Sequence, residues 1–149
     1  MLERAVSACP DNLWDDPRYH NRFWLLTYHT LFYTDLYSQE SIEKVEGWSK
    51  RLPEIHFLDM TPPPDSHPIT PGEPYKKEDL IEYIEYIRGK MPERIEKTNW
   101  NALSGFPWIS LDKFELSLYN LRHLQHHTAQ LIDRIRQEAG RGVAWVGRG

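Results

Sequence analysis

A proline-rich stretch divides this chain into two parts with helical sequence patterns. Residues 60–74 read MTPPPDSHPITPGEP, and proline can continue neither a helix nor a central strand because it lacks a backbone N–H. A connection this long is uncommon inside a compact domain and usually covers or crosses it. We therefore expect residues 38–75 to be an ordered crossover rather than a linker. Because such a stiff segment has little entropy to lose, we expect residues 60–75 to pack on the helices.

The part before the crossover predicts two helices. MLERAVSAC predicts a short helix that stops before Pro10, either as a remnant of a trimmed one or as one that leans on a partner chain. Asp16-Pro17 is a typical helix start, and the sequence from there to about Tyr37 has no Gly or Pro. Apolar and aromatic residues recur along it at helical spacing, namely Leu25, Leu26, His29, Phe32, Tyr33 and Leu36.

The part after the crossover predicts two longer helices. The first spans about residues 75–100, with Gly89 and Pro92 expected to weaken or kink it. The second is predicted to be capped by Ser110, to run to Ala139 and to end at Gly140. No convincing strand pattern is found. The predicted fold is all-α, a four-helix bundle with a long crossover between the second and third helices, forming one domain over residues 1–149.

Composition narrows the class of protein. The net charge is -4, which gives no general attraction to nucleic acid or acidic membranes. Cys9 is the only cysteine, so no intramolecular disulfide can form, as is common in a reducing cytoplasm. No apolar run approaches the ~20 residues needed to span a bilayer, and the first residues lack a signal-peptide pattern. We expect a cytoplasmic protein that binds neither nucleic acid nor membrane.

The stretch LRHLQHHTAQL, residues 121–131, concentrates His123, His126 and His127 on the last predicted helix. His123 and His127 are four residues apart and share a helix face, whereas His126 is rotated by about 100° from His127 and lies nearer the edge. Two histidines at this spacing can bind one ion, but the pattern alone favours a pair that is hydrogen-bonded in the core or half-exposed. The predicted apolar neighbours of this face are Leu121, Leu124, Leu131, Ile132 and Ile135.

His29 favours the metal interpretation. It lies on the aromatic stripe of an earlier helix, where a histidine without a partner for its nitrogens is costly. One divalent ion would satisfy His29, His123 and His127 together and leave a fourth position open. Other motifs are absent: Leu124 follows His123 where a zincin has Glu, and there is no G-x-S-x-G elbow. RGVAWVGRG, residues 141–149, follows a helix rather than a strand, so it predicts a solvated tail rather than a nucleotide loop.

The segments WLLTYHTLFYTDLY and NLRHLQHHTAQL resemble those of the DinB-like, or YfiT-like, proteins. That family consists of four-helix bundles with one metal-binding histidine on the second helix and an H-x3-H pair on the fourth. The resemblance implies that His29, His123 and His127 are metal ligands. It extends over roughly residues 11–139, but many members read HHRGQ where this chain has HHTAQ. The family includes transferases and isomerases that use low-molecular-weight thiols.

These patterns lead to a first functional hypothesis, a metal-dependent enzyme. Zinc or nickel is expected, since imidazole suits both. The open position would take a small-molecule substrate, either a low-molecular-weight thiol for S-transfer or a water for hydrolysis of an ester or amide. No catalytic residue is assigned. Tyr28, Tyr33, Asp35 and His126 are candidates for acid–base roles, with packing or solvent exposure as the alternative for each.

The second hypothesis belongs to another class. The chain would be a non-catalytic helical interaction or dimerisation module with a structural or vestigial metal site. Phe106, Trp108 and Trp145 are predicted to be exposed and would suit a partner surface. A homodimer is expected under either hypothesis.

Overall fold

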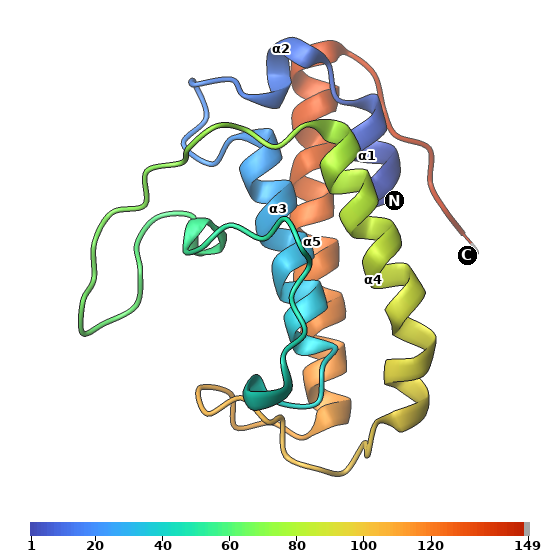
Figure 1. Cartoon of the computed structure of the whole chain (residues 1–149). Helices are drawn as coiled ribbons and strands as arrows, with labels where there is room; N and C mark the ends of the chain where they lie inside the picture. Colours follow the sequence, from blue (N-terminus) through green and yellow to red (C-terminus); the bar gives the residue numbers. More distant parts are fainter. Residues whose placement is uncertain (148–149) are drawn as a thin grey trace.

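The computed structural model describes residues 1–147, which fold into α-helices joined by turns and one long connection (Figure 1). In chain order the elements are α1 (Leu2–Ala8), α2 (Asp11–Trp14), α3 (Phe23–Tyr37), the 3-10 turns η1 (Ile42–Lys44) and η2 (Ile55–Phe57), α4 (Lys77–Lys97) and α5 (Lys113–Ala139). No strand occurs in this part of the chain, where the only β-type pairings are two isolated bridges. The all-α prediction is confirmed for the described residues.

Helix α3 is the centre of the molecule. It contacts α5, α4 and η2, and every one of its residues is buried except His29 and Tyr33. A helix that is covered on almost all sides needs partners for its polar groups. The hydroxyls of Thr27, Thr30 and Thr34 find them by donating to the backbone carbonyls four residues earlier, at 2.6–2.8 Å. His29 and Tyr33, the two residues left partly open, lie one turn apart and form a narrow accessible strip along α3, called the seam below.

The predicted start of α3 is wrong. Asp16 does not cap a helix at Pro17, because its carboxylate accepts hydrogen bonds from the backbone N–H and guanidinium of Arg18 and so closes a local turn. The chain then bends back, and Asp15 accepts a 2.6 Å bond from the Trp24 indole. The helix therefore begins only at Phe23.

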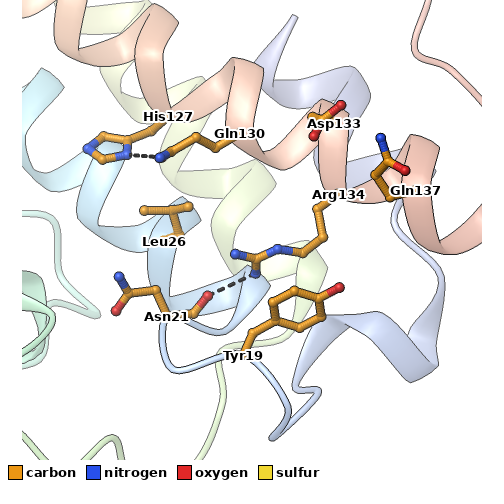
Figure 2. A pocket seen from close by; sticks show the side chains of 8 residues that line it. All are labelled: Tyr19, Asn21, Leu26, His127, Gln130, Asp133, Arg134 and Gln137. Carbon is orange, nitrogen blue, oxygen red and sulfur yellow. Dashed lines mark hydrogen bonds between the residues drawn. The ribbon is translucent and has the colours of Figure 1, made fainter.

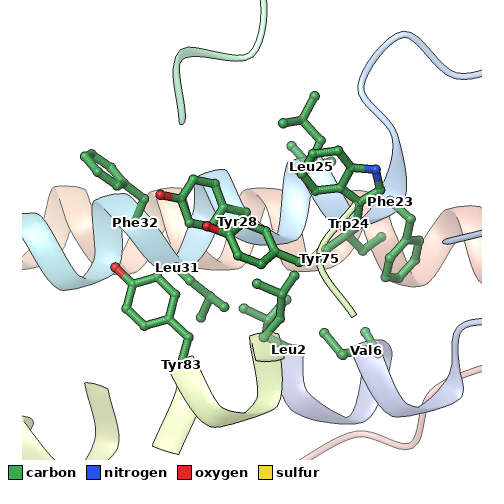
Figure 3. Packing of buried hydrophobic residues seen from close by; sticks show 14 of the residues in the cluster. Leu2, Val6, Phe23, Trp24, Leu25, Tyr28, Leu31, Phe32, Tyr75 and Tyr83 are labelled. Atoms are coloured by element: carbon green, nitrogen blue, oxygen red, sulfur yellow. The ribbon is translucent and has the colours of Figure 1, made fainter. Parts of the chain in front are cut away.

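Aromatic packing joins the long connection to the helices. Tyr75, which lies just before α4, stacks on Tyr28 of α3 with ring centroids 4.9 Å apart (Figure 3). Trp48 stacks on Tyr83 of α4, with ring centroids 4.4 Å apart. The Trp14 indole also donates to the carbonyl of Tyr75 at 2.7 Å. These contacts anchor the connection at its two ends, since Trp48 belongs to its first part and Tyr75 to its last residues.

Between these anchors part of the connection does not pack on the helices as predicted. Residues 62–68 are all exposed, and Figure 1 shows the connection extending away from the helices here. The expectation that residues 60–75 pack on the helices is therefore wrong for this stretch. The loop is closed locally instead, with Thr61 bonded through its backbone N–H and hydroxyl to residues 65 and 67 and with the bridge between Met60 and Pro68. The earlier segment through η2 does pack on α3.

The remaining helix ends follow recognisable local chemistry. Helix α5 is capped by Asp112, not Ser110: its carboxylate accepts from the Glu115 N–H, and Glu115 bonds back to the Asp112 N–H in a capping box. Gly140 ends α5 with a left-handed φ of 62°, as predicted. Helix α4 continues through Gly89 and Pro92 to Lys97, and α1 is covered by α4 and α5 of its own chain.

The exposure of two side chains differs from the prediction. Phe106 is buried, packed against Tyr37 and below the Lys113 ammonium, whereas Trp108 and Trp145 are exposed as expected. Leu121 was expected on the apolar side of α5 but is exposed. Among the described residues, no helix has the length and apolar character to cross a bilayer. Residues 148–149 of the predicted tail lie outside the described residues.

One buried ion pair ties α3 to α4. Asp35 is almost fully buried and accepts from the Arg94 guanidinium at 2.7 Å and from the Tyr83 hydroxyl at 3.0 Å. A buried pair of this kind contributes little compared with apolar packing, but removing one partner leaves the other charge without compensation.

We predict that Asp35→Ala will lower the free energy of unfolding by about 3–5 kcal/mol, because Arg94 stays buried without its counter-ion. Glu46→Ala, which breaks an exposed pair with Lys90, should cost less than about 1 kcal/mol. Urea denaturation of both variants measures this, and equal losses would contradict the structural role given to Asp35.

Candidate metal centre

The open seam of α3 faces α5 at the position of the predicted histidines. His29 projects from α3, and His123 and His127 project from successive turns of α5. Their ring centroids are 4.5–5.0 Å apart, and one nitrogen from each ring can be chosen so that all three lie within 4.8 Å of one another. The structure therefore brings together the three residues chosen from the sequence as a group that could hold a metal ion.

A backbone carbonyl fixes the orientation of His29. Its Nδ1–H donates to the carbonyl oxygen of His56 in η2 at 2.6 Å, so that a neutral His29 carries its lone pair on Nε2. That lone pair points to the Nε2 of His123, 3.0 Å away. In the neutral cluster His123 must then be the donor of this bond, since His29 Nε2 has no proton to give.

His123 has no second partner among the described residues. Its Nδ1 is buried and without a hydrogen bond. His127 does have one, because its Nδ1 lies 2.8 Å from the side-chain oxygen of Gln130, which leaves Nε2 free. A hydrogen bond to the outer nitrogen of a metal-binding imidazole fixes its tautomer and orientation. His29 and His127 thus have the arrangement of oriented ligands, and His123 does not.

The spacing of the nitrogens fits a small ion after modest side-chain movement. An ion bound tetrahedrally at ~2.0–2.1 Å would hold its ligand nitrogens roughly 3.3 Å apart. His29 and His123 are already near that separation, and His127 can approach by a change of side-chain angle. The donor set is imidazole only, which suits zinc, nickel or copper rather than magnesium or calcium.

Burial keeps the imidazoles neutral, which is the state that binds a metal. Desolvation lowers the pKa of His29 to about 4 and that of His123 to about 3, and neighbouring histidines act in the same direction. The pKa of His127 is also lowered by burial, although its bond to Gln130 opposes this shift. Protons therefore compete weakly with a metal for these nitrogens near neutral pH.

Of the other candidate residues, only one borders the histidine cluster. The Tyr33 ring packs edge-on against His29 and His123, with centroids 5.0 and 5.5 Å apart, so it borders the cluster. Tyr28 instead bonds to the backbone of Leu52, and Asp35 is engaged with Arg94. His126 is exposed, as predicted for an edge position.

Two features of the site were missed in the sequence. His56 contributes its backbone carbonyl, which no residue pattern can signal, and its own ring stacks on Phe32 at 3.7 Å. A hollow of ≈ 370 Å³ also opens beside His127, lined by residues of α5, by Leu26 and by the segment before α3 (Figure 2). Its α5 residues continue the face of His127 at helical spacing, so extending that face by two turns would have indicated them.

Comparisons of the chain with protein-family models, with curated proteins and with solved structures found no match.

The lowered pKa values predict how metal-free protein responds to acid. Unfolded histidines titrate near pH 6.5, so below that pH the unfolded chain binds more protons than the folded one. Stability in the presence of chelator should therefore be greatest above about pH 6.5 and should fall as the pH drops towards about 4. Urea denaturation at a series of pH values measures this.

The same series has an internal control. His123→Asn should show a smaller loss between these pH values, because one buried imidazole is gone, whereas the exposed His126→Asn should follow the wild type. Identical pH profiles for His123→Asn and the wild type would contradict the burial argument.

Proposed function

We propose that this protein is a DinB-like four-helix bundle and a metal-dependent enzyme, in which His29, His123 and His127 hold one divalent ion. The observation that carries the proposal is the convergence of three partly buried imidazoles from two helices. The hydrogen bonds to the outer nitrogens of His29 and His127 support the proposal, because they direct the Nε2 atom of each ring towards the cluster.

Zinc or nickel is the proposed ion. With three imidazole ligands it would retain an open position and supply Lewis acidity there, activating a thiol or a water. The proposed reaction is thiol S-transfer, with hydrolysis as its closest alternative. The proposed substrates are small molecules, including a low-molecular-weight thiol.

Tyr33 and the η2 turn lie beside the proposed metal site and define its surroundings. Tyr33 borders the cluster, and burial raises the pKa of its hydroxyl, so at neutral pH it can donate a hydrogen bond but cannot act as a base. The η2 turn holds His29 in place through the His56 carbonyl. We assign Tyr33 a positioning role towards a polar group of the substrate.

A second candidate function, an interaction module, is supported by a different observation. Phe114, Leu118 and Leu121 follow one another at i, i+4 and i+7 on α5, and each is more than half exposed. Such an apolar face on a helix suits a second copy of the chain, because the same residues can pair across a two-fold axis. This face is the proposed homodimer contact, whether or not the protein is an enzyme.

The metal site is tested by neighbouring histidines on one helix. His123→Ala should abolish stoichiometric metal binding by untagged protein, because it removes one of three converging ligands. His126→Ala should retain the metal, since His126 is exposed. Metal at 100 to 1,000 times its dissociation constant should stabilise the wild type by roughly 3–4 kcal/mol, a gain that His123→Ala should lose.

Metal analysis and melting curves with metal or chelator measure both quantities. If His126→Ala loses the metal while His123→Ala keeps it, the assigned helix face is wrong. If no protein responds to metal or chelator, the interaction module replaces the enzyme.

The dimer is tested by a charge on the exposed face. Leu118→Glu should shift the sedimentation mass from dimer to monomer, because the carboxylate would be buried without a partner. Ile95→Glu, a similarly exposed aliphatic position on α4 and not on this face, should leave the mass unchanged. A wild type that is already monomeric would remove this contact from the proposal.

A further inference from the structure

The hollow beside His127 has polar groups that the histidine cluster does not use. His127, Gln130 and Arg134 lie along one face of α5, and Tyr19, Asn21 and Leu26 stand opposite them (Figure 2). The hollow is therefore continuous with one proposed metal ligand at one end and has a cationic side chain two helical turns away.

Arg134 has the features of an anion-binding residue. It is partly buried, and its guanidinium lies 4.1 Å from the Tyr19 ring centroid and donates to the carbonyl of Asn21 at 2.8 Å. No carboxylate of residues 1–147 pairs with it, and its other nitrogens are not sealed from solvent. A guanidinium has five N–H donors in a rigid fork, so most of them remain available to a ligand.

The charges around Arg134 favour a ligand group with a single negative charge. Asp133 also lines the hollow and has a 3.7 Å contact with Arg136. Asp16 and Glu138 lie near enough to act on Arg134 electrostatically, but both are paired with Arg18. Arg134 is therefore the cation of the lining that has no carboxylate partner of its own. This balance suits a carboxylate better than a phosphate dianion, which would meet repulsion from Asp133.

We propose that this hollow binds a small molecule whose carboxylate is held by Arg134 and whose other end reaches the histidine cluster. This assignment rests on the proposed function, since it takes the cluster as the reacting end. The two anchors are seven residues apart on α5, which separates their backbone positions by about 10 Å along the helix axis, and the ligand is expected to be of this length. Substrates with a carboxylate at that reach are selected over neutral ones of equal length.

Matched probes test this selection. Mercaptoalkanoic acids of increasing chain length are titrated into zinc-loaded protein by calorimetry, each beside the mercaptoalkanol of equal length. The wild type should bind the best acid about tenfold or more tightly than its alcohol, as expected for a charge-assisted hydrogen bond. Acids too short to reach both anchors should show no such preference.

Arginine variants assign the effect to one side chain. Arg134→Gln should lose the preference for acid over alcohol while binding the alcohol as before, which also shows that the variant is folded. Arg134→Lys should keep part of the preference because it keeps the charge. Arg88→Gln, an equal charge change on α4 far along the chain, should behave as the wild type.

An experiment without metal distinguishes the carboxylate subsite from the proposed metal site. Hexanoate is titrated into chelator-treated protein and followed by the backbone NMR signals of Asn21 and Gln130, which should shift in the wild type and not in Arg134→Gln. If zinc does not bind but hexanoate shifts these signals, the proposed function fails and the carboxylate subsite stands. If zinc binds and acids gain nothing over alcohols, the subsite is overturned.

Discussion

The near-complete burial of α3 is the constraint on which the rest of the structure depends. A helix covered by α4, α5 and the η2 turn can present side chains to a reaction space only along the positions that its neighbours leave open. Those positions are His29 and Tyr33, one turn apart, while Leu26 borders the hollow beside His127. The site lies at this seam because every other side of α3 is filled with packed aromatic, aliphatic and threonine side chains.

The long connection contributes to the site through its backbone. After leaving α3 it returns to pack η2 against that helix, and there the His56 carbonyl accepts the Nδ1–H of His29. This single bond selects the tautomer of His29 and directs its free nitrogen towards α5. The proline-rich stretch that follows makes no comparable contribution, since residues 62–68 extend into solvent.

Helix α5 combines three surfaces along its length. His123 and His127 face α3, Gln130 and Arg134 line the hollow, and Phe114, Leu118 and Leu121 form an exposed apolar face nearer its start. The helix can do this because it is 27 residues long and firmly capped at both ends by Asp112 and Gly140. Its length places the proposed metal, substrate and dimer contacts on one rigid element.

The sequence by itself determined the helices and the histidines that can meet. The 3.6-residue period placed His123 and His127 on one face and His126 at the edge, and the cost of an unpaired imidazole among aromatics singled out His29. Helix starts were predicted less well. Asp16 and Ser110 both resemble caps, yet Arg18 engages Asp16, and the capping box of Asp112 and Glu115 begins α5 instead.

Only the tertiary structure decided how the site is completed. The carbonyl of His56 is a group that every residue has, so its bond to His29 depends on chain path and not on side-chain identity. The same holds for Phe106, which is buried because Tyr37 and Lys113 lie beside it. It also holds for Arg134, which has no ion pair of its own because Arg18, distant in sequence, pairs with the nearby Asp16 and Glu138. Periodicity reports which face a residue occupies on its own helix. What stands opposite that face depends on long-range packing, which periodicity does not contain.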